Sequence, residues 1–169
     1  MEVNKNIFLI GFMGCGKSTI ARQLAQKLSS DIVEMDEAIE AEAGMSINEI
    51  FEVYGETYFR DLESQLIERI TLSGGAIVSC GGGAILHQKN VDTMRKNGQI
   101  IYLSATPETI YERVRFSTNR PLLNGNMNVD YITSLMEKRL PLYKSAADKT
   151  IFVDMKNIEE ITKEIISIL

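Results

Sequence analysis

The segment from Gly11 to Thr19 constrains this chain more than any other, because it fits the phosphate-binding pattern G-x-x-x-x-G-K-[ST]. The apolar run 7–10 leads into it and predicts a buried strand. A helix is predicted after it, because apolar residues recur at every fourth position: Ile20, Leu24 and Leu28. A strand, a glycine-rich loop and a helix N-terminus together form a cradle of backbone N–H groups for phosphate.

This loop supplies the first candidate ligands of a nucleotide. Lys17 would reach the terminal phosphates, and Ser18 would bind Mg²⁺ directly. The candidate ATP-binding residues of the loop are Gly14, Cys15, Gly16, Lys17, Ser18 and Thr19. The alternative is a glycine turn before a helix with an accidental lysine, and the flanking strand and helix favour the nucleotide site.

Length and composition narrow the class of protein. A chain of 169 residues fits one domain, 1–169. Its net charge of −5 argues against nucleic-acid binding and against docking on an anionic membrane. No apolar run is long enough to span a bilayer, and residues 1–5 do not begin a secretory signal. Cys15 and Cys80 have no metal-ligand spacing, so we expect reduced thiols and a cytoplasmic protein.

Strand-like apolar runs alternate with helical patterns along the chain. The expected strands are 6–10, 32–35, 76–80, 99–103 and 150–153. They are almost continuously apolar, which is typical of a parallel sheet that is covered on both faces. The pattern predicts an α/β fold of three layers, with a five-stranded parallel sheet and helices on both faces. Helix starts are predicted at Ser46, Thr106 and Asn157 from their capping patterns.

A polar, asparagine-rich segment, 117–128, interrupts this alternation. Segments of this length between two helices are often lids or binding loops. Arg120 lies in its middle and favours a mobile lid over approximately 113–128, because a P-loop enzyme needs cations that arrive on closure. A passive loop is the alternative.

The class of P-loop protein follows from what accompanies the loop. Neither the guanine-reading N-K-x-D pattern nor the D-x-x-G switch of GTPases is present. Motor ATPases need a longer chain. The chain length and the expected lid indicate a kinase for a small molecule or a nucleotide.

Motifs outside the P-loop are more specific. They are Glu34–Glu40 after the second strand, Phe51–Arg60 after a helix, Ser79–Ala84 at the end of the third strand, Arg120–Leu123 in the lid, and Arg139–Tyr143 on the next helix. In this order they closely resemble shikimate kinase over essentially the whole chain. The glycine triplet, the Phe-Arg pair after Gly-Glu, and Arg-x-Pro-Leu-Tyr carry most of the resemblance.

The resemblance implies phosphorylation of the 3-hydroxyl of shikimate by ATP, with Mg²⁺ as cofactor, on the route to chorismate and the aromatic amino acids. The implied substrate-binding residues are Asp36, Arg60, Gly81, Gly82, Gly83 and Arg139, within and beyond a helical region of approximately 36–65. Arg113, Arg120 and Lys156 would join the ATP site, and the catalytic residues would be Lys17, Asp36 and Arg120. We expect a monomer with small-molecule partners alone.

The residue types suit this chemistry independently. Arg60 and Arg139 can each supply a forked donor for a carboxylate, and Asp36 can accept a hydroxyl proton. The glycine triplet lets the backbone approach a ligand at the carboxyl end of a parallel strand. The alternatives are a surface Arg60 paired with Asp61 or Glu63, a solvated Arg139, an Asp36 that only caps a helix, and a merely flexible glycine turn.

Glu34 is the main departure from the family pattern, which usually has Asp-x-Asp at this place. Here the pair is Glu34-x-Asp36, and glutamate keeps the charge but reaches one methylene further. We expect Glu34 to act on Mg²⁺ through water. His87 is the one histidine, and no family motif uses it, so we expect a surface residue.

Two other functions stay open at this stage. Other small kinases share the P-loop and the lid, so the acceptor could be another polyol or acid such as gluconate, or a nucleotide. A nucleoside monophosphate site would not need the set of Arg60, the glycine triplet and Arg139. A nucleotide-binding regulator with little turnover is the second alternative, and the presence of Lys17, Ser18 and Asp36 argues against it.

Overall fold

Five parallel strands form the central sheet of the computed structural model, which describes residues 4–116 and 127–169. The spatial order is β2-β3-β1-β4-β5. The strands are β1 (Asn6–Ile10), β2 (Asp31–Glu34), β3 (Ala76–Ser79), β4 (Gly98–Ser104) and β5 (Lys149–Phe152). The predicted α/β fold with a five-stranded parallel sheet is therefore confirmed.

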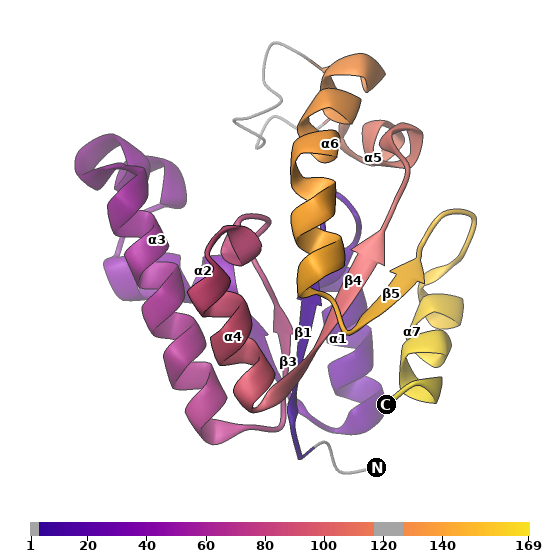
Figure 1. Cartoon of the computed structure of the whole chain (residues 1–169), viewed down its shortest axis with the longest axis horizontal. Helices are drawn as coiled ribbons and strands as arrows, with labels where there is room; N and C mark the ends of the chain where they lie inside the picture. The colour runs from indigo at the N-terminus through magenta and orange to yellow at the C-terminus, as the bar shows by residue number, and fades with distance from the viewer. Residues whose placement is uncertain (1–3, 117–126) are drawn as a thin grey trace.

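Helices cover both faces of this sheet (Figure 1). They are α1 (Lys17–Leu28), α2 (Met35–Ala43), α3 (Ile47–Ser73), α4 (Gln88–Lys96), α5 (Pro107–Val114), α6 (Val129–Ala146) and α7 (Ile158–Ser167), with a short 3₁₀ helix at Ala84–Leu86. Helices α1 and α7 pack on one face, and α4 and α6 pack on the other. This gives the three layers that the alternating pattern predicts.

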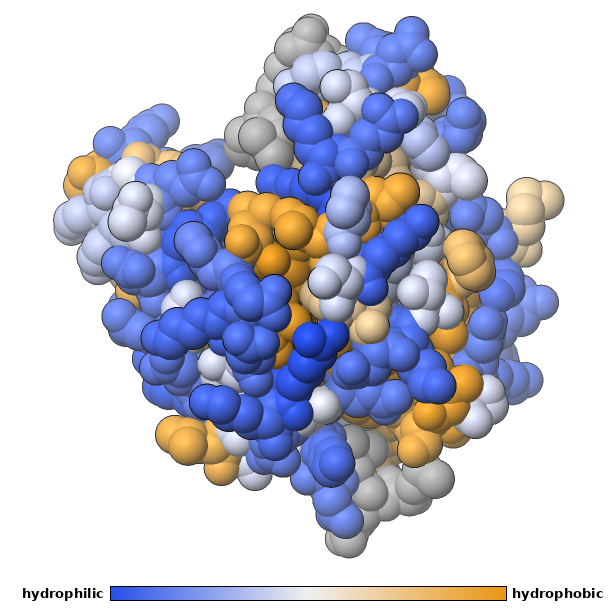
Figure 2. All heavy atoms as spheres, in the orientation of Figure 1, coloured by the Kyte–Doolittle hydropathy of each residue, from blue (hydrophilic) through white to orange (hydrophobic). Residues whose placement is uncertain are grey.

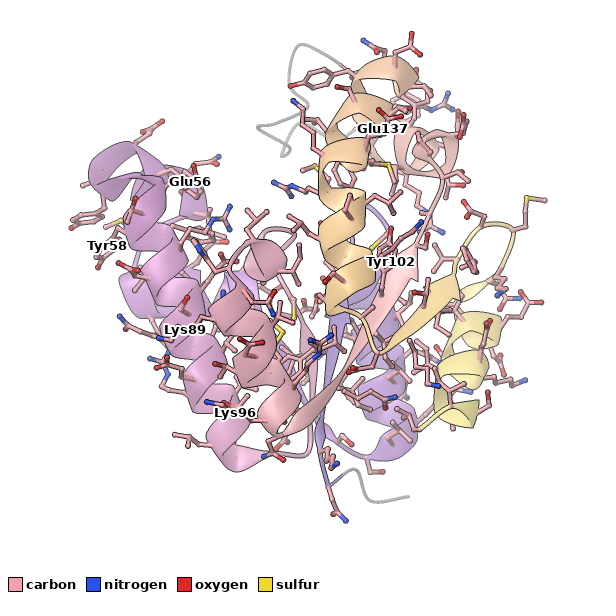
Figure 3. All side chains as sticks on the ribbon, in the orientation of Figure 1. Glu56, Tyr58, Lys89, Lys96, Tyr102 and Glu137 are labelled. Carbon is pink, nitrogen blue, oxygen red and sulfur yellow. The ribbon has the colours of Figure 1, made fainter. Side chains whose placement is uncertain are left out.

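The central strands are mostly apolar because both of their faces are covered. Every residue of β1 and β3 is buried, whereas the edge strands β2 and β5 are partly exposed. On the α6 side, the ring of Tyr102 from β4, labelled in Figure 3, stacks on the ring of Tyr143 with centroids 5.2 Å apart. This stack holds α6 against the sheet.

The phosphate-binding loop connects β1 to α1 at the carboxyl edge of the sheet. Gly14 and Gly16 have φ angles of 79° and 100°, in the left-handed region that favours glycine. Gly16 occupies the N-cap of α1 and has no side chain to cap the helix. The first backbone N–H groups of α1 are therefore available to a phosphate.

The predicted helix starts are confirmed in detail. Ser46 and Asn157 each form a capping box, and Thr106 accepts a hydrogen bond from the backbone N–H of Thr109. The segment 51–60 was expected to follow a helix, and this expectation is wrong. It lies inside α3, whose axis breaks at Gly55, where φ is +83°.

The expected lid is described only at its borders. Residue 113 lies in α5, and Asn128 caps α6 through a hydrogen bond to the backbone N–H of Tyr131. Arg120 and the rest of 117–126 lie outside the described residues. Among the helices that the structure describes, none is long and apolar enough to cross a membrane.

Candidate active site

A cleft of about 1590 Å³ opens at the carboxyl edge of the sheet. Its walls come from the phosphate-binding loop, from α2 and α3, from the turn after β3, and from α5, α6 and the start of α7. Figure 2 shows the surface hollowed between the first turns of α3 and the upper part of α6. The cleft exceeds the roughly 300–1,000 Å³ of a typical small-molecule pocket, so it has room for two ligands.

Almost all of the sequence-predicted site residues that the structure describes line this one cleft. They are Gly14, Gly16, Lys17, Ser18, Thr19, Glu34, Asp36, Arg60, Gly81, Gly82, Gly83, Arg113, Arg139 and Lys156. Cys15 is the exception, because its side chain is fully buried beneath the loop. Arg120 lies outside the described residues, and His87 is exposed at the start of α4, as expected for a surface residue.

The ammonium group of Lys17 lies over the loop that precedes it. Its Nζ donates hydrogen bonds to the carbonyl oxygens of Gly11, at 2.8 Å, and Phe12, at 3.2 Å. These bonds hold the cation at the mouth of the anion cradle formed by the start of α1. A bound phosphate would therefore meet backbone donors and a positioned positive charge together.

Oxygen atoms gather beside Ser18, where a metal ion would be needed. The Ser18 hydroxyl donates to Glu34 Oε2 at 2.8 Å, and the Ser79 hydroxyl oxygen lies 3.4 Å from that of Ser18. Arg22 lies 3.3 Å from Glu34 Oε1, which is buried and accepts no hydrogen bond from the described residues. Mg²⁺ prefers oxygen ligands and typically uses few carboxylates plus substrate phosphates, so this set fits it.

Two carboxylates meet at the other end of the cleft, next to Gly81. A Cβ atom on Gly81 would lie 2.9 Å from Asp36 Oδ1 and 3.0 Å from Glu63 Oε1. Asp36 is open to the cleft, but the protein crowds its remaining sides, and this desolvation raises its pKa, while nearby Lys17 partly offsets the rise. Burial likewise raises the pKa of Glu63, and Arg60 partly offsets that rise.

Arg60 faces the cleft from α3 and is held by two carboxylates. It pairs with Glu63, whose side chain is 1% exposed, and with Glu56, which is labelled in Figure 3. The pairing proposed for a surface Arg60 is thus present, but the arginine side chain is only 14% exposed and lines the cleft. A Cβ atom on Gly83 would collide with its guanidinium group. Glycine at this position is therefore needed for Arg60 to lie where it does.

Arg139 approaches the same glycine turn from α6. A Cβ atom on Gly82 would lie 3.3 Å from Arg139 Nη1. One helical turn later, the Tyr143 hydroxyl donates a 2.7 Å hydrogen bond to the Gly82 carbonyl. The two guanidinium groups therefore flank a glycine turn beside Asp36, which suits an anionic ligand that also carries hydroxyls.

The end of the cleft that lies away from Arg60 and Arg139 is bounded by α5 and by the loop between β5 and α7. Arg113 donates to the carbonyl oxygens of Cys15, at 2.9 Å, and Gly14, at 3.4 Å. Lys156 pairs with Glu164 at 2.6 Å. Both side chains line the cleft. A nucleotide whose phosphates lie in the phosphate-binding loop would extend toward them.

Glu63 is the site residue that sequence reasoning missed. The sequence indicated it only as one of two partners for a surface Arg60. Its spacing of three residues from Arg60 on a helix was the available signal. Its burial depends on how α3 packs against the glycine turn, and so does the approach to Asp36 of its free oxygen, Oε1, which has no hydrogen-bond partner among the described residues.

Comparison with known proteins shows one family. The family model described as shikimate kinase matches residues 13–169. A shikimate kinase from Dehalococcoides mccartyi is 42% identical over 165 residues, which cover 98% of this chain and 93% of the relative. A shikimate kinase from Persephonella marina is 43% identical over 96% of this chain and 97% of the relative.

Solved structures show the same likeness. The chain is similar to a shikimate kinase from Acinetobacter baumannii in complex with shikimate, with a TM-score of 0.91 and 32% identity over 99% of this chain and 93% of that one. It also resembles a gluconokinase from Sinorhizobium meliloti, with a TM-score of 0.60 over 99% of this chain and 92% of that one. That pair is only 14% identical, so this likeness concerns the fold alone.

Proposed function

The chain belongs to the shikimate kinase family, and we propose that it transfers the γ-phosphoryl group of ATP to the 3-hydroxyl of shikimate. The products are ADP and shikimate 3-phosphate, on the route to chorismate and aromatic amino acids. We further propose that the chain acts as a cytoplasmic monomer and that 1–169 is one domain. In this proposal, 36–65 serves as the substrate region and 113–128 as the lid.

One observation carries this proposal: a single cleft combines a phosphate-binding loop at one end with Asp36, Arg60, Arg139 and a glycine turn at the other. Shikimate has one carboxylate and three hydroxyls, so its site needs cations, a hydroxyl acceptor and close backbone approach. The second end of the cleft offers all three. Its volume is large enough for both substrates together.

The phosphate end acts through position and charge. Backbone N–H groups at the start of α1 bind the β- and γ-phosphates, and Lys17 moves its ammonium from loop carbonyls to the terminal phosphate. Ser18 and, through water, Glu34 would hold Mg²⁺, which would supply positive charge to neutralise the phosphates. Arg113 and Lys156 border the nucleoside, and Arg120 adds a cation at the transferred group. Closure over this end excludes water and limits ATP hydrolysis.

The acceptor end orients the hydroxyl. Arg60 and Arg139 bind the carboxylate of shikimate, and the glycine turn lets the ring approach the backbone. Asp36 accepts the proton of the 3-hydroxyl, whose oxygen attacks the γ-phosphorus in line with the departing ADP. Glu63 keeps Arg60 in place. Because little covalent chemistry falls to the protein, positioning and electrostatics supply the catalysis.

The pH dependence of the reaction tests the role of Asp36. Because burial raises its pKa, Asp36 takes up a proton at a higher pH than an ordinary aspartate. We expect kcat/KM for shikimate to fall as the pH falls through this raised pKa. Replacing Glu40 with glutamine removes a negative charge that raises the pKa of Asp36, so it should move the acid limb to lower pH. An acid limb in the ordinary aspartate range, unmoved by Glu40→Gln, would contradict this role.

The Mg²⁺ requirement tests Glu34. Glutamine keeps an acceptor for the Ser18 hydroxyl but lacks the charge, so Glu34→Gln should raise the Mg²⁺ concentration for half-maximal turnover by about tenfold. Titration of Mg²⁺ at fixed ATP measures it. Glu37→Gln is the matched control, because Glu37 also contacts Arg22 but is largely exposed. An unchanged requirement in Glu34→Gln would remove Glu34 from the metal site.

Product analysis tests the proposed reaction itself. Nuclear magnetic resonance of the product formed from MgATP and shikimate should show one phosphate, coupled to the proton at carbon 3. A phosphate on another hydroxyl would keep the kinase assignment but reject the proposed placement of Asp36.

A further inference from the structure

Helix α5 is the outer support of the phosphate-binding loop. Its buried residues Ile110 and Val114 lie against Gly14, so that a Cβ atom on Gly14 would collide with the Val114 side chain. Arg113 of the same helix donates to the carbonyls of Gly14 and Cys15. Any shift of α5 therefore shifts the loop that would hold the phosphates.

The loop 154–157 bounds the same end of the cleft from the other side. It is part of the connection 153–157 between β5 and α7, and its residues Lys156 and Asn157 line the cleft. Asn157 also forms the capping box of α7, and Lys156 pairs with Glu164 on that helix. One end of the loop is thus fixed to α7.

A single carboxylate oxygen ties the other end of this loop to α5. Asp154 Oδ1 accepts hydrogen bonds from the backbone N–H of Thr106 at 2.9 Å, from the Thr106 hydroxyl at 2.9 Å, and from the Thr109 hydroxyl at 2.6 Å. Thr106 is the N-cap of α5, and Thr109 lies in its first turn. Partial burial opposes the charged form of Asp154, but these bonds together outweigh it and lower the pKa of Asp154, so its carboxylate is charged at neutral pH. A charged acceptor near a helix N-terminus is also favoured by the helix dipole.

We propose that Asp154 is a positioning residue for the nucleotide. Its carboxylate joins the two walls of the Arg113 end of the cleft, the loop 154–157 and helix α5. This inference rests on the proposed function, because it requires that the nucleotide lies between those walls. Asp154 does not line the cleft, so it acts through α5 and through its own loop rather than by touching ATP.

Calorimetric binding of ADP and of shikimate to the full chain tests this role. Asp154→Asn loses the charge of the shared acceptor and should weaken ADP binding by about tenfold while leaving shikimate affinity unchanged. Thr109→Val removes one donor at nearly constant volume and should weaken ADP binding by a smaller factor. If both residues act through the same contact, the effects of the two substitutions are not independent. The double variant should then lose less ADP affinity than the product of the two single losses.

Asp148→Asn is the matched control. Asp148 precedes β5, at the opposite end of that strand, and also accepts a bond from a backbone N–H, that of Ile100, at 2.8 Å. It should leave ADP affinity unchanged. Equal losses of ADP and shikimate affinity in Asp154→Asn, or wild-type ADP affinity in that variant, would overturn the proposal. If Asp154→Asn does not fold, the test rests on Thr109→Val. Unchanged ADP affinity in that variant then overturns the proposal. A wild-type chain that binds no ADP would instead reject the proposed function.

Discussion

Lys17→Ala should lower kcat by about 10²–10³-fold or more, because the transferred phosphoryl group then loses a positioned positive charge in the transition state. The structure places the Lys17 ammonium 2.8 Å from the Gly11 carbonyl, at the mouth of the phosphate cradle. Steady-state turnover with saturating MgATP and shikimate measures the loss. Shikimate binding, measured by calorimetry without nucleotide, should remain, because Lys17 acts on the phosphates.

Lys27→Ala is the control for this variant. Lys27 lies on the same helix, α1, but at its far end, where it pairs with Glu159 at 3.7 Å. We expect near wild-type turnover from it. If Lys17→Ala kept most of its turnover, the phosphate-binding loop would not be the site of transfer.

Arg139→Ala should weaken shikimate binding by about 2–5 kcal/mol, because the carboxylate of shikimate then loses one of its two arginine partners in the cleft. Calorimetric titration with shikimate measures this loss, and ADP titration should show little change. Arg139→Lys keeps the charge but lacks the forked donors, so its affinity for shikimate should lie between that of the wild type and that of Arg139→Ala.

Arg69→Ala is the control that shows whether removing any arginine weakens shikimate binding. Arg69 lies on α3, is half exposed, and pairs with Glu42 away from the cleft. It should bind shikimate like the wild type. An Arg139→Ala variant that changed ADP affinity alone would show that Arg139 serves the nucleotide, and the assignment of the two ends of the cleft would then be wrong.

Much of the fold could be predicted because its signals are local. The strands of a covered parallel sheet are continuous apolar runs, and each structural boundary lies within one residue of its expected position. Helix starts at Ser46, Thr106 and Asn157 depend on caps three or four residues long. The course of α3 was not predicted beyond its start, because Gly55 is non-helical and divides α3 into two helical parts that meet at a kink.

Some residues of the candidate site could likewise be predicted from the sequence, and others could not. Lys17 and Ser18 belong to a motif whose spacing alone indicates their place. Asp36, Arg60 and Arg139 were indicated by resemblance, and the structure brings them to one cleft. The roles of Glu63 and Asp154 could not be predicted, because they depend on contacts between elements distant in the sequence. Asp154 meets Thr106 across 48 residues, and the free oxygen of Glu63 lies near Asp36 only once α3 packs on the glycine turn.

The most direct test of the proposed function is ADP release from MgATP with shikimate, gluconate, AMP or no acceptor. The proposal predicts rapid release with shikimate and only background release in the other three reactions. Release that is equal with and without shikimate, from a chain that binds ATP, would contradict it. Faster release with gluconate or AMP would assign the acceptor end of the cleft to a different substrate.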